Sequence, residues 1–327
     1  MGNRPKADYL WFDGEYLPWD AGMVHLQTHT LHYGLGIFEG IRAYEQSSGG
    51  TAVFRLDDHL RRFEGSARIL EMNLPYDRQT LKQVTLELIR RNALPACYIR
   101  PLALLGAGAM GIYPRDNPVQ VSIMTWPWGA YLGEEALTKG IRCKISSYTR
   151  HFPNSMLLKA KATGNYINSI LAKREAVRLG YEEAIMLDIN GCVAEGTGEN
   201  LFILRDGKLI TPPLSSVLQG ITRDTIMKLA AAEGLEVYDR AFTRDELYLA
   251  EEAFLTGTAA EVTPIREVDD RVIGEGRPGP VTLRLQKRYF QVIRGERDEW
   301  KDWLEPVPTA TDDDSFSVSG VESIPAN

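Results

Sequence analysis

The chain has 327 residues, 44% hydrophobic and 25% charged, which is typical of a folded globular protein with room for two domains. Its formal charge of −7 provides no basic excess for binding nucleic acid or anionic lipid, and no run approaches the roughly 18 apolar residues of a membrane span. The first residues lack an apolar signal segment and the three cysteines form no CxxC pair. We therefore expect a cytoplasmic protein with reduced thiols and no nucleic-acid or membrane partner.

The first third of the chain mixes predicted strands and helices. Asp13–Gly14 forms a turn between two short strand-like segments, and residues 31–46 alternate like a strand. Residues 57–74 predict a helix, capped by Asp57 or Asp58, whose apolar stripe contains Leu60, Phe63, Ala67 and Leu70. A second helix is predicted to start at Thr80 with Gln83 completing a capping box, and strands are predicted at 97–105 and 119–126.

The second half begins after residues 125–136, which combine Pro, Gly and aromatic residues and are predicted to be an interdomain linker. Asn190–Gly191 and Asp206–Gly207 separate apolar runs, which predicts an antiparallel meander. Further predicted elements are a strand at 141–148 and helices at 165–180, 220–234 and 280–304. The expected architecture is an α/β (α+β) fold with a small N-terminal domain (1–124), the linker, a large domain (137–305) and a disordered tail (306–327).

Two candidate sites have weak support. The segment Gly106–Gly111 (GAGAMG) fits the G-x-G-x-x-G dinucleotide fingerprint, but Pro114 and Pro118 exclude the helix that must follow it. A nicotinamide oxidoreductase is therefore an unfavoured alternative. His25, His29 and His32 are spaced like metal ligands, but no nearby cysteine or carboxylate completes a site, so we expect no metal.

Several stretches indicate binding of anions. In the predicted strand GIFEGIRAY, Phe38, Gly40, Arg42 and Tyr44 share one face, and Tyr98 and Arg100 share a face in CYIRPL. An arginine within an apolar strand needs an anion, either a partner carboxylate or a substrate. Gly220, Ile221 and Thr222 lie where a loop enters a helix, a position that favours phosphate, and TGTAAE (256–261) is a second turn able to donate backbone N–H groups.

The stretch MLLKAKATGNY (156–166) contains two lysines, Lys159 and Lys161, at the edge of an apolar run. Desolvation at such a place can turn a lysine into a nucleophile. VAEGTGEN adds two carboxylates, Glu195 and Glu199. A phosphate cradle, a reactive lysine and a carboxylate beside a pyridine nitrogen are the requirements of pyridoxal phosphate chemistry. Spacing does not choose between the two lysines, because both would face the same way in an extended chain.

Seven ordered motifs resemble those of the branched-chain amino acid aminotransferases, which are class IV, fold type IV pyridoxal phosphate enzymes. The motifs are HYGLGIFEGIRAY, HLRRFEGSA, YIRPL, KATGNYINS, EGTGENLF, GITRDTI and TGTAAEVTPI, and the resemblance spans about residues 8–305. It implies that Lys161, five residues before Tyr166, is the Schiff-base lysine and that Lys159 is a bystander. It also implies pyridoxal 5′-phosphate as the cofactor.

The resemblance assigns further roles, residue by residue. Glu195 would pair with the pyridine nitrogen and Tyr166 would face the phenolic oxygen, while Arg62, Gly220, Ile221, Thr222 and Thr258 would hold the phosphate. The expected substrate residues are Tyr33, Phe38, Tyr98, Arg100, Trp128, Tyr131, Thr258 and Ala259, together with Gly40 and Arg42, which are included because they share a strand face with Phe38. Among these, Tyr98 with the backbone of Thr258 and Ala259 would receive the α-carboxylate, and Arg100 the side-chain carboxylate of glutamate.

The implied activity is transfer of the amino group of L-leucine, L-isoleucine or L-valine to 2-oxoglutarate by a ping-pong mechanism. The substrates would be branched-chain amino acids, glutamate and their 2-oxo acids. The family shares its active site between subunits, so a homodimer or an assembly of dimers is expected. A D-amino acid or (R)-amine aminotransferase and an aminodeoxychorismate lyase remain alternatives on the same fold.

Overall fold

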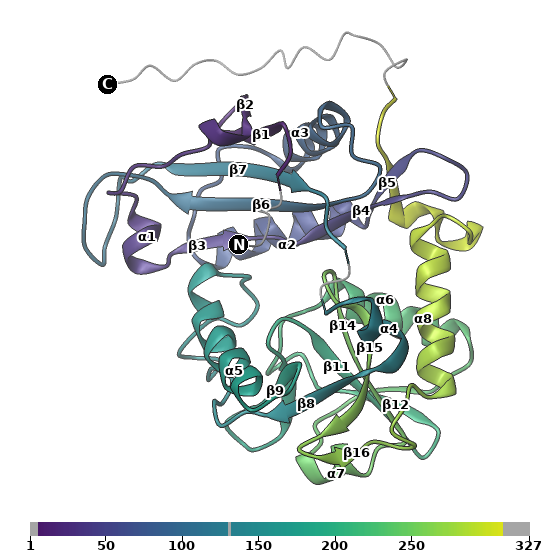
Figure 1. The fold of residues 1–327 in the computed structure, drawn as a ribbon. Coiled ribbons are helices and arrows are strands. Elements are labelled where there is room, and N and C mark those ends of the chain that lie inside the picture. The colour runs from purple at the N-terminus through teal and green to yellow at the C-terminus, as the bar shows by residue number, and fades with distance from the viewer. Residues whose placement is uncertain (1–5, 130–131, 310–327) are drawn as a thin grey trace.

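The computed structural model describes residues 6–129 and 132–309, which form two sheet-based domains, one above the other in Figure 1. The first sheet is antiparallel throughout, in the order β17-β5-β4-β6-β7-β1-β2, with β3 also paired to β6. Its strands are β1 (Tyr9–Phe12), β2 (Glu15–Pro18), β3 (Gly36–Phe38), β4 (Ile41–Glu45), β5 (Thr51–Phe54), β6 (Cys97–Leu105), β7 (Val119–Trp126) and β17 (Leu304–Pro306).

The second sheet has the order β10-β9-β8-β15-β14-β11-β12-β13, with β16 paired to β15. It is mixed, because β8 runs parallel to both β9 and β15, and β12 runs parallel to β13. Its strands are β8 (Ile141–Ile145), β9 (Glu183–Leu187), β10 (Val193–Gly196), β11 (Asn200–Arg205), β12 (Lys208–Thr211), β13 (Val237–Asp239), β14 (Glu252–Gly257), β15 (Glu261–Val268) and β16 (Arg271–Val272). The two-domain α/β fold predicted from the sequence is confirmed.

The predicted meander is wrong in one respect. The β9–β10 and β11–β12 hairpins both form, but β8, β15 and β14 lie between them in the sheet. β11 pairs with β14 instead of β10, because β14 and β15 form a long hairpin that fills the centre. The backbone at Asp206 and Gly207 has φ of 49° and 70°, as the predicted Asp-Gly turn requires.

Helices pack against both sheets (Figure 1). They are α1 (His29–Tyr33), α2 (Leu56–Ile69), α3 (Arg78–Arg91), α4 (Glu134–Lys139), α5 (Tyr166–Arg178), α6 (Ile221–Ala232), α7 (Arg244–Tyr248) and α8 (Pro280–Ile293), with 3₁₀ turns at Trp19–Ala21, Thr163–Asn165 and Asp298–Trp303. No helix in the described part of the chain is long and apolar enough to cross a membrane.

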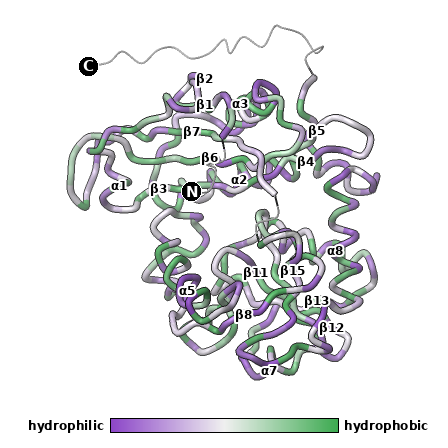
Figure 2. Tube along the Cα trace, viewed as in Figure 1, coloured by the Kyte–Doolittle hydropathy of each residue, from purple (hydrophilic) through white to green (hydrophobic). Residues whose placement is uncertain are grey.

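The predicted stripe of the first long helix packs on the first sheet. Leu60, Phe63 and Ala67 of α2 are buried, with Leu70 partly buried beside them. Burying a leucine or phenylalanine side chain contributes about 1.5–3 kcal/mol, which explains why this stripe sets the orientation of α2. β6 and β7 of this sheet are hydrophobic over most of their length (Figure 2).

Three local predictions need correction. Residues 31–46 are not one strand: α1 ends at Gly34, whose φ of 74° favours glycine, and β3 and β4 follow. The predicted caps are also displaced. Asp57 and Asp58 lie inside the first turn of α2, and Asp77, not Thr80, caps α3 by accepting the backbone N–H of Thr80 at 2.8 Å.

Two of the expected domain limits, 125 and 305, fall inside strands of the first sheet. Residues 125 and 126 belong to β7, where Trp126 still pairs with Tyr98 of β6. Near the other end, β17 returns to the first sheet and covers the edge of β5, which would otherwise present unpaired backbone groups. Most of the predicted tail, 310–327, lies outside the described residues.

The GAGAMG segment connects β6 to β7 without a helix, so it lacks the architecture of a dinucleotide site. The imidazole of His29 contacts the carbonyl of Gly111 at 2.7 Å and that of His32 contacts the carbonyl of Leu26 at 2.8 Å. Both rings therefore hold loops in place.

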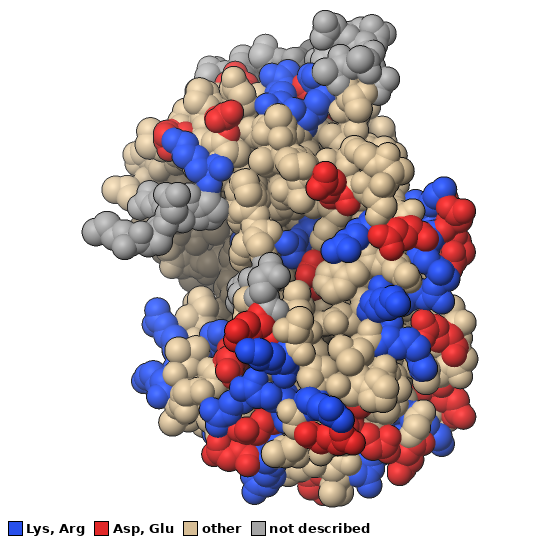
Figure 3. All heavy atoms as spheres, turned by 45° about the vertical axis from the view of Figure 1, so that its right-hand side comes forward, with Lys and Arg blue, Asp and Glu red and all other residues tan. Residues whose placement is uncertain are grey.

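Charges of both signs are intermixed on the face shown in Figure 3.

Candidate active site

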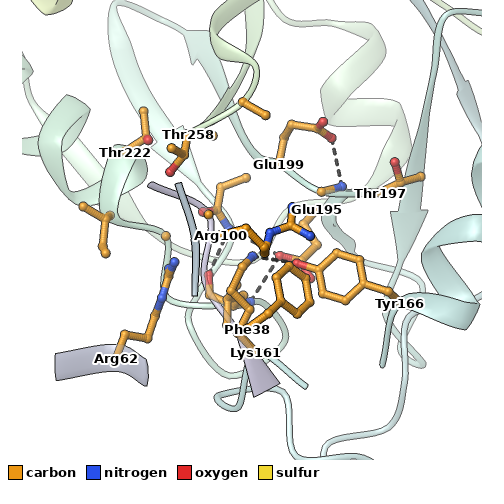
Figure 4. Close-up of a pocket in the computed structure, with 18 of the residues that line it drawn as sticks. Phe38, Arg62, Arg100, Lys161, Tyr166, Glu195, Thr197, Glu199, Thr222 and Thr258 are labelled. Carbon is orange, nitrogen blue, oxygen red and sulfur yellow. Dashed lines mark hydrogen bonds between the residues drawn. The ribbon is translucent and has the colours of Figure 1, made fainter. Parts of the chain in front are cut away.

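A cavity of about 450 Å³ lies between the two domains, a volume suited to a small-molecule ligand (Figure 4). Residues of both domains line it. Of the expected site residues, those that line the cavity are Phe38, Gly40, Arg62, Tyr98, Arg100, Trp128, Lys161, Tyr166, Glu195, Gly220, Ile221, Thr222, Thr258 and Ala259. The fold thus brings together segments that are far apart in the sequence.

Lys161 lies just before α5, and its backbone is fixed to the first domain. Its N–H donates to Ser66 Oγ at 3.0 Å, and its carbonyl accepts the N–H of Phe38 at 3.0 Å. The side-chain amine donates to Tyr166 Oη at 2.7 Å and lies 5.0 Å from the centroid of the Phe38 ring. The amine is therefore held at one defined place in the cavity wall, between two aromatic rings (Figure 4).

The two lysines of the MLLKAKATGNY stretch point to different places. They would share a direction in an extended chain, but Leu158 and Lys159 lie in a turn. The Lys159 amine donates to the carbonyl of Val217 at 3.1 Å, and burial lowers its pKa. Among the described residues that line the cavity, only Lys161 supplies an amine.

Glu195, at the end of the β9–β10 hairpin, is a buried carboxylate with an arginine partner. Its Oε1 lies 2.7 Å from Arg150 Nε, and its Oε2 accepts the backbone N–H of Leu218 at 3.1 Å. Burial raises the pKa of Glu195, while Arg150 and the Leu218 N–H favour the ionised form. A further cation in the cavity, such as a protonated pyridine nitrogen, would offset the cost of burying this charged carboxylate. The sequence did not predict this role of Arg150, because nothing in residues 149–154 (TRHFPN) indicates where its side chain points.

Glu199 has a different environment. It is buried, and its Oε2 accepts the N–H of Gly198 at 3.0 Å. Burial, reinforced by the nearby carboxylate of Glu183, raises the pKa of Glu199 to about 8. The raised pKa favours the neutral acid, which compensates the charge of a cationic ring less well than an ionised carboxylate does. The structure therefore favours Glu195 for that role.

The N-terminus of α6 forms one end of the cavity. Gly220 precedes the helix and no side chain caps it, so the first N–H groups of Ile221 and Thr222 remain available for an anion. A Cβ on Gly220 would lie 1.8 Å from Asn200 Oδ1, so only glycine fits there. The Thr256 hydroxyl is also buried without a hydrogen-bond partner in the described structure. These groups fit a phosphate.

Arg62 of α2 reaches the same end of the cavity. Its Nη1 donates to the carbonyl of Gln219 at 2.8 Å, and its Nε and Nη2 donate to the two oxygens of Glu39 at 2.7 and 2.8 Å. Glu39 is fully buried and also contacts His59 Nδ1 at 2.8 Å. Burial alone would raise the pKa of Glu39, but Arg62 and His59 hold it well below its ordinary value. This carboxylate, which sequence reasoning missed, fixes the guanidinium beside α6.

The opposite end of the cavity is aromatic. The Tyr98 ring meets the Trp128 ring at 4.3 Å, edge to face. Arg100 Nη2 donates to Tyr98 Oη at 3.1 Å, and its guanidinium lies 4.7 Å from the centroid of the Phe38 ring. Arg100 Nε is buried and has no hydrogen-bond partner among the described residues. A partly buried guanidinium with such a nitrogen is suited to receive an anionic ligand.

Gly40 gives the Tyr98 hydroxyl room, since a Cβ there would lie 2.1 Å from Tyr98 Oη. Two of the expected substrate residues do not line the cavity in this chain. Tyr33 is 47% exposed and stacks on His29 at 4.5 Å, and Arg42 points toward Glu261 and the carbonyl of Trp128. Tyr131 lies outside the described residues.

No group of three or more His, Cys, Asp or Glu side chains in the described ranges is arranged to hold a metal ion. The cavity instead combines an amine, a buried carboxylate, an anion-binding helix end and an aromatic wall. In Figure 4, Thr222 and Thr258 lie on one side and Tyr166 on the other, with Lys161 and Glu195 between them.

Comparisons with known proteins show the family of the chain. The family described as amino-transferase class IV matches residues 36–268. The branched-chain-amino-acid aminotransferase of Pseudomonas aeruginosa is 50% identical over 303 residues, 93% of this chain and 98% of the relative. The crystal structure of the branched-chain amino acid aminotransferase of Escherichia coli superposes with a TM-score of 0.90 at 47% identity, covering 93% of this chain and all of that one.

A further solved structure is a branched-chain amino acid aminotransferase complexed with N-(5′-phosphopyridoxyl)-L-glutamate, which gives the same TM-score, 0.90, at 47% identity. It covers 93% of this chain and 100% of that one. The family model covers most of the chain, and the relatives agree with it in sequence and fold over 93% of its length. The protein therefore belongs to the class IV aminotransferases, in the branched-chain-amino-acid aminotransferase family.

Proposed function

We infer that this protein is a pyridoxal phosphate-dependent transaminase that moves the amino group of L-leucine, L-isoleucine or L-valine to 2-oxoglutarate. One observation carries the proposal: a single cavity collects the Lys161 amine, the Arg150-paired carboxylate of Glu195 and the free N–H groups of α6. The names of the close relatives give the substrate class, and one relative binds a phosphopyridoxyl-glutamate conjugate.

The residues present fit the cofactor. The phosphate would be held by Arg62, the N–H groups of Ile221 and Thr222 and the hydroxyl of Thr258, with the ring nitrogen toward Glu195. When bound, pyridoxal phosphate supplies an aldehyde for an amine and a protonated ring that accepts negative charge from the substrate Cα. Glu195 keeps that ring protonated, because a buried carboxylate gains from a cation next to it.

Lys161 would have two roles. Its amine would hold the cofactor until a substrate amino group replaces it, and the released amine would then take the proton from the substrate Cα and return it as a general base and acid. Tyr166, whose hydroxyl accepts a hydrogen bond from this amine at 2.7 Å, would keep the amine in place for both roles.

The aromatic end of the cavity would accept both classes of substrate. Phe38, Tyr98 and Trp128 surround a branched aliphatic side chain. Arg100 meets the side-chain carboxylate of glutamate or 2-oxoglutarate through the Nε that lacks a partner among the described residues. The α-carboxylate of either substrate would bind Tyr98 and the Thr258–Ala259 turn.

A homodimer completes the proposal. Apolar side chains are exposed on α1 and the β6–β7 connection (Tyr33, Met110, Ile112 and Tyr113) and on α5 (Ile167 and Ile170). These elements lie along the same side of both domains in Figure 1, and apolar surface of this kind favours a second copy. Tyr33, which does not line the cavity of its own chain, would then serve the cavity of the partner. A cytoplasmic location agrees with the three free cysteines.

A panel of L- and D-amino acids with 2-oxoglutarate tests the proposal. We expect turnover of L-leucine, L-isoleucine and L-valine with glutamate as a product, and an absorbance change in the cofactor when each amino acid is added alone. Preference for D-amino acids or (R)-amines, or cleavage of aminodeoxychorismate without transamination, would assign one of the alternative activities on this fold.

A further inference from the structure

Arg42 is a buried cation that joins the two domains. It lies on β4, and its Nη1 is 3.1 Å from Glu261 Oε1 at the start of β15. Its Nη2 donates to the carbonyls of Trp128 at 2.7 Å and Gly129 at 3.3 Å. The Arg42 and Glu261 side chains are only 11% and 8% exposed. One guanidinium therefore ties the segment after β7 to the second domain.

Glu261 has a backbone conformation that glycine usually adopts. Its φ is +54°, and it pairs with Gly257 across the turn that contains Thr258 and Ala259. This conformation is unfavourable for a residue with a Cβ, and contacts of its side chain can offset the cost. The anchors here are Arg42 and Tyr44, whose hydroxyl donates to Glu261 Oε1 at 3.1 Å. The side chain of Glu261 thus fixes the end of the turn.

The tyrosine that anchors Glu261 stays protonated. Burial raises the pKa of Tyr44 and of Tyr289, on α8, so both hydroxyls keep their protons at neutral pH. The Tyr44 hydroxyl can therefore donate its hydrogen bond to Glu261 under the conditions of the assay.

We propose that Arg42 and Glu261 form an interdomain clamp that positions Trp128 and the Thr258–Ala259 turn around the substrate. The proposal rests on the transaminase function and refines the role of Arg42, which acts as a positioning residue instead of a substrate ligand. The clamp sets the distance between the aromatic wall and the carboxylate-binding turn. Both classes of substrate carry an α-carboxylate, so both depend on it.

Single-turnover measurements on the cofactor-loaded protein test the clamp. Arg42→Met and Glu261→Gln should each raise the apparent Kd of leucine and of glutamate by about 10- to 100-fold, the scale of losing one charge-assisted hydrogen bond to the α-carboxylate. The limiting rates should change less. Both variants remove the same contact. The double variant should therefore bind substrate no less tightly than the more impaired of the two single variants. Additive losses, or a loss with Arg42→Met and none with Glu261→Gln, would mean that Arg42 binds substrate directly.

Two further variants separate the contact from the backbone and from folding. Glu261→Gly accepts the positive φ without the anchor, so it should resemble Glu261→Gln; wild-type behaviour would overturn the clamp. If Arg42→Met does not fold, Arg42→Lys can replace it. Lysine keeps the charge but not the planar guanidinium, so Arg42→Lys should raise the Kd by a smaller factor. The pair Arg277 and Glu275 provides the matched control. Arg277→Met and Glu275→Gln remove an ion pair of the same type whose side chains are both exposed.

Amide hydrogen exchange gives a readout that needs no turnover. Peptides containing Trp128 and peptides containing Thr258–Ala259 should exchange faster in Arg42→Met and Glu261→Gln than in the wild type and in the control pair. Unchanged exchange in both regions would overturn the clamp. If the wild type transaminates no amino acid, the proposed function fails, and this exchange measurement still decides whether the clamp exists.

Discussion

Replacement of Arg100 by methionine separates recognition of the two substrate classes. An apolar pocket rejects a carboxylate because of its desolvation cost, so one cavity that accepts leucine and glutamate needs a cation that engages only the second. Arg100 meets this requirement: it donates to Tyr98 Oη at 3.1 Å, and its buried Nε has no partner in the described structure. Methionine preserves much of the packing on Phe38 and removes the charge.

The magnitude follows from the bond that would be lost. A charge-assisted hydrogen bond contributes roughly 1.5–3 kcal/mol, which corresponds to about 10- to 150-fold in affinity. We therefore expect Arg100→Met to impair the glutamate half-reaction by about that factor. The leucine half-reaction should stay within about threefold, since an aliphatic side chain makes no charge-assisted bond.

Single-turnover absorbance measurements on each half-reaction provide the assay. Arg91→Met is a suitable control, because Arg91 also lies over an aromatic ring, that of Tyr16 at 4.1 Å, but outside the cavity. Equal losses for leucine and glutamate with Arg100→Met would refute the reasoning and assign Arg100 to the α-carboxylate or to the structure of the cavity wall.

The remaining predictions concern other residues of the cavity. Lys161→Ala should reduce transamination at least ~10³-fold, and Lys159→Ala should stay within about tenfold in the same steady-state assay; the reverse order would contradict the assignment. Glu195→Gln should retain cofactor but slow deuterium washout from Cα-labelled leucine by orders of magnitude, and a larger effect of Glu199→Gln would show that Glu195 is the wrong carboxylate. Glu39→Gln should weaken cofactor binding about tenfold in an absorbance titration, because the phosphate arginine loses its anchor, and unchanged affinity would contradict this. The raised pKa of Glu199, about 8 against 4.5, means that its protonated form stabilises the fold below pH 4.5 and that this contribution falls as pH rises to about 8. Glu199→Gln should therefore flatten the pH dependence of the free energy of unfolding in that window, measured by urea denaturation; an unchanged slope would refute the shift.

Sequence patterns predicted the elements whose signals are local. The strand-like segments of β6 and β7 and the periodic stripe of α2 predicted correct elements, because strand and helix periodicities follow from the burial of apolar side chains. The short helix α1 was missed, since its five residues carry too little periodicity and its end depends on a single glycine, Gly34.

Local sequence patterns did not predict where side chains point in irregular segments. The separation of Lys159 from Lys161 depends on a turn, and it required the family resemblance to anticipate which lysine faces the cavity. Arg42 was assigned to the substrate because it shares a strand face with Phe38, yet its partner Glu261 is more than two hundred positions away in the sequence. Glu39 likewise became visible only through its long-range contacts with Arg62.

The central claim is that Lys161 is the residue that bonds to the cofactor. Borohydride reduction of the cofactor-loaded protein, followed by proteolysis and mass mapping, measures this directly because it fixes the bond before the peptides are separated. We predict a single phosphopyridoxyl adduct on the peptide that contains Lys161, and its absence from the Lys161→Ala variant. An adduct on Lys159, or a wild-type protein that retains no cofactor after reduction, would contradict the account.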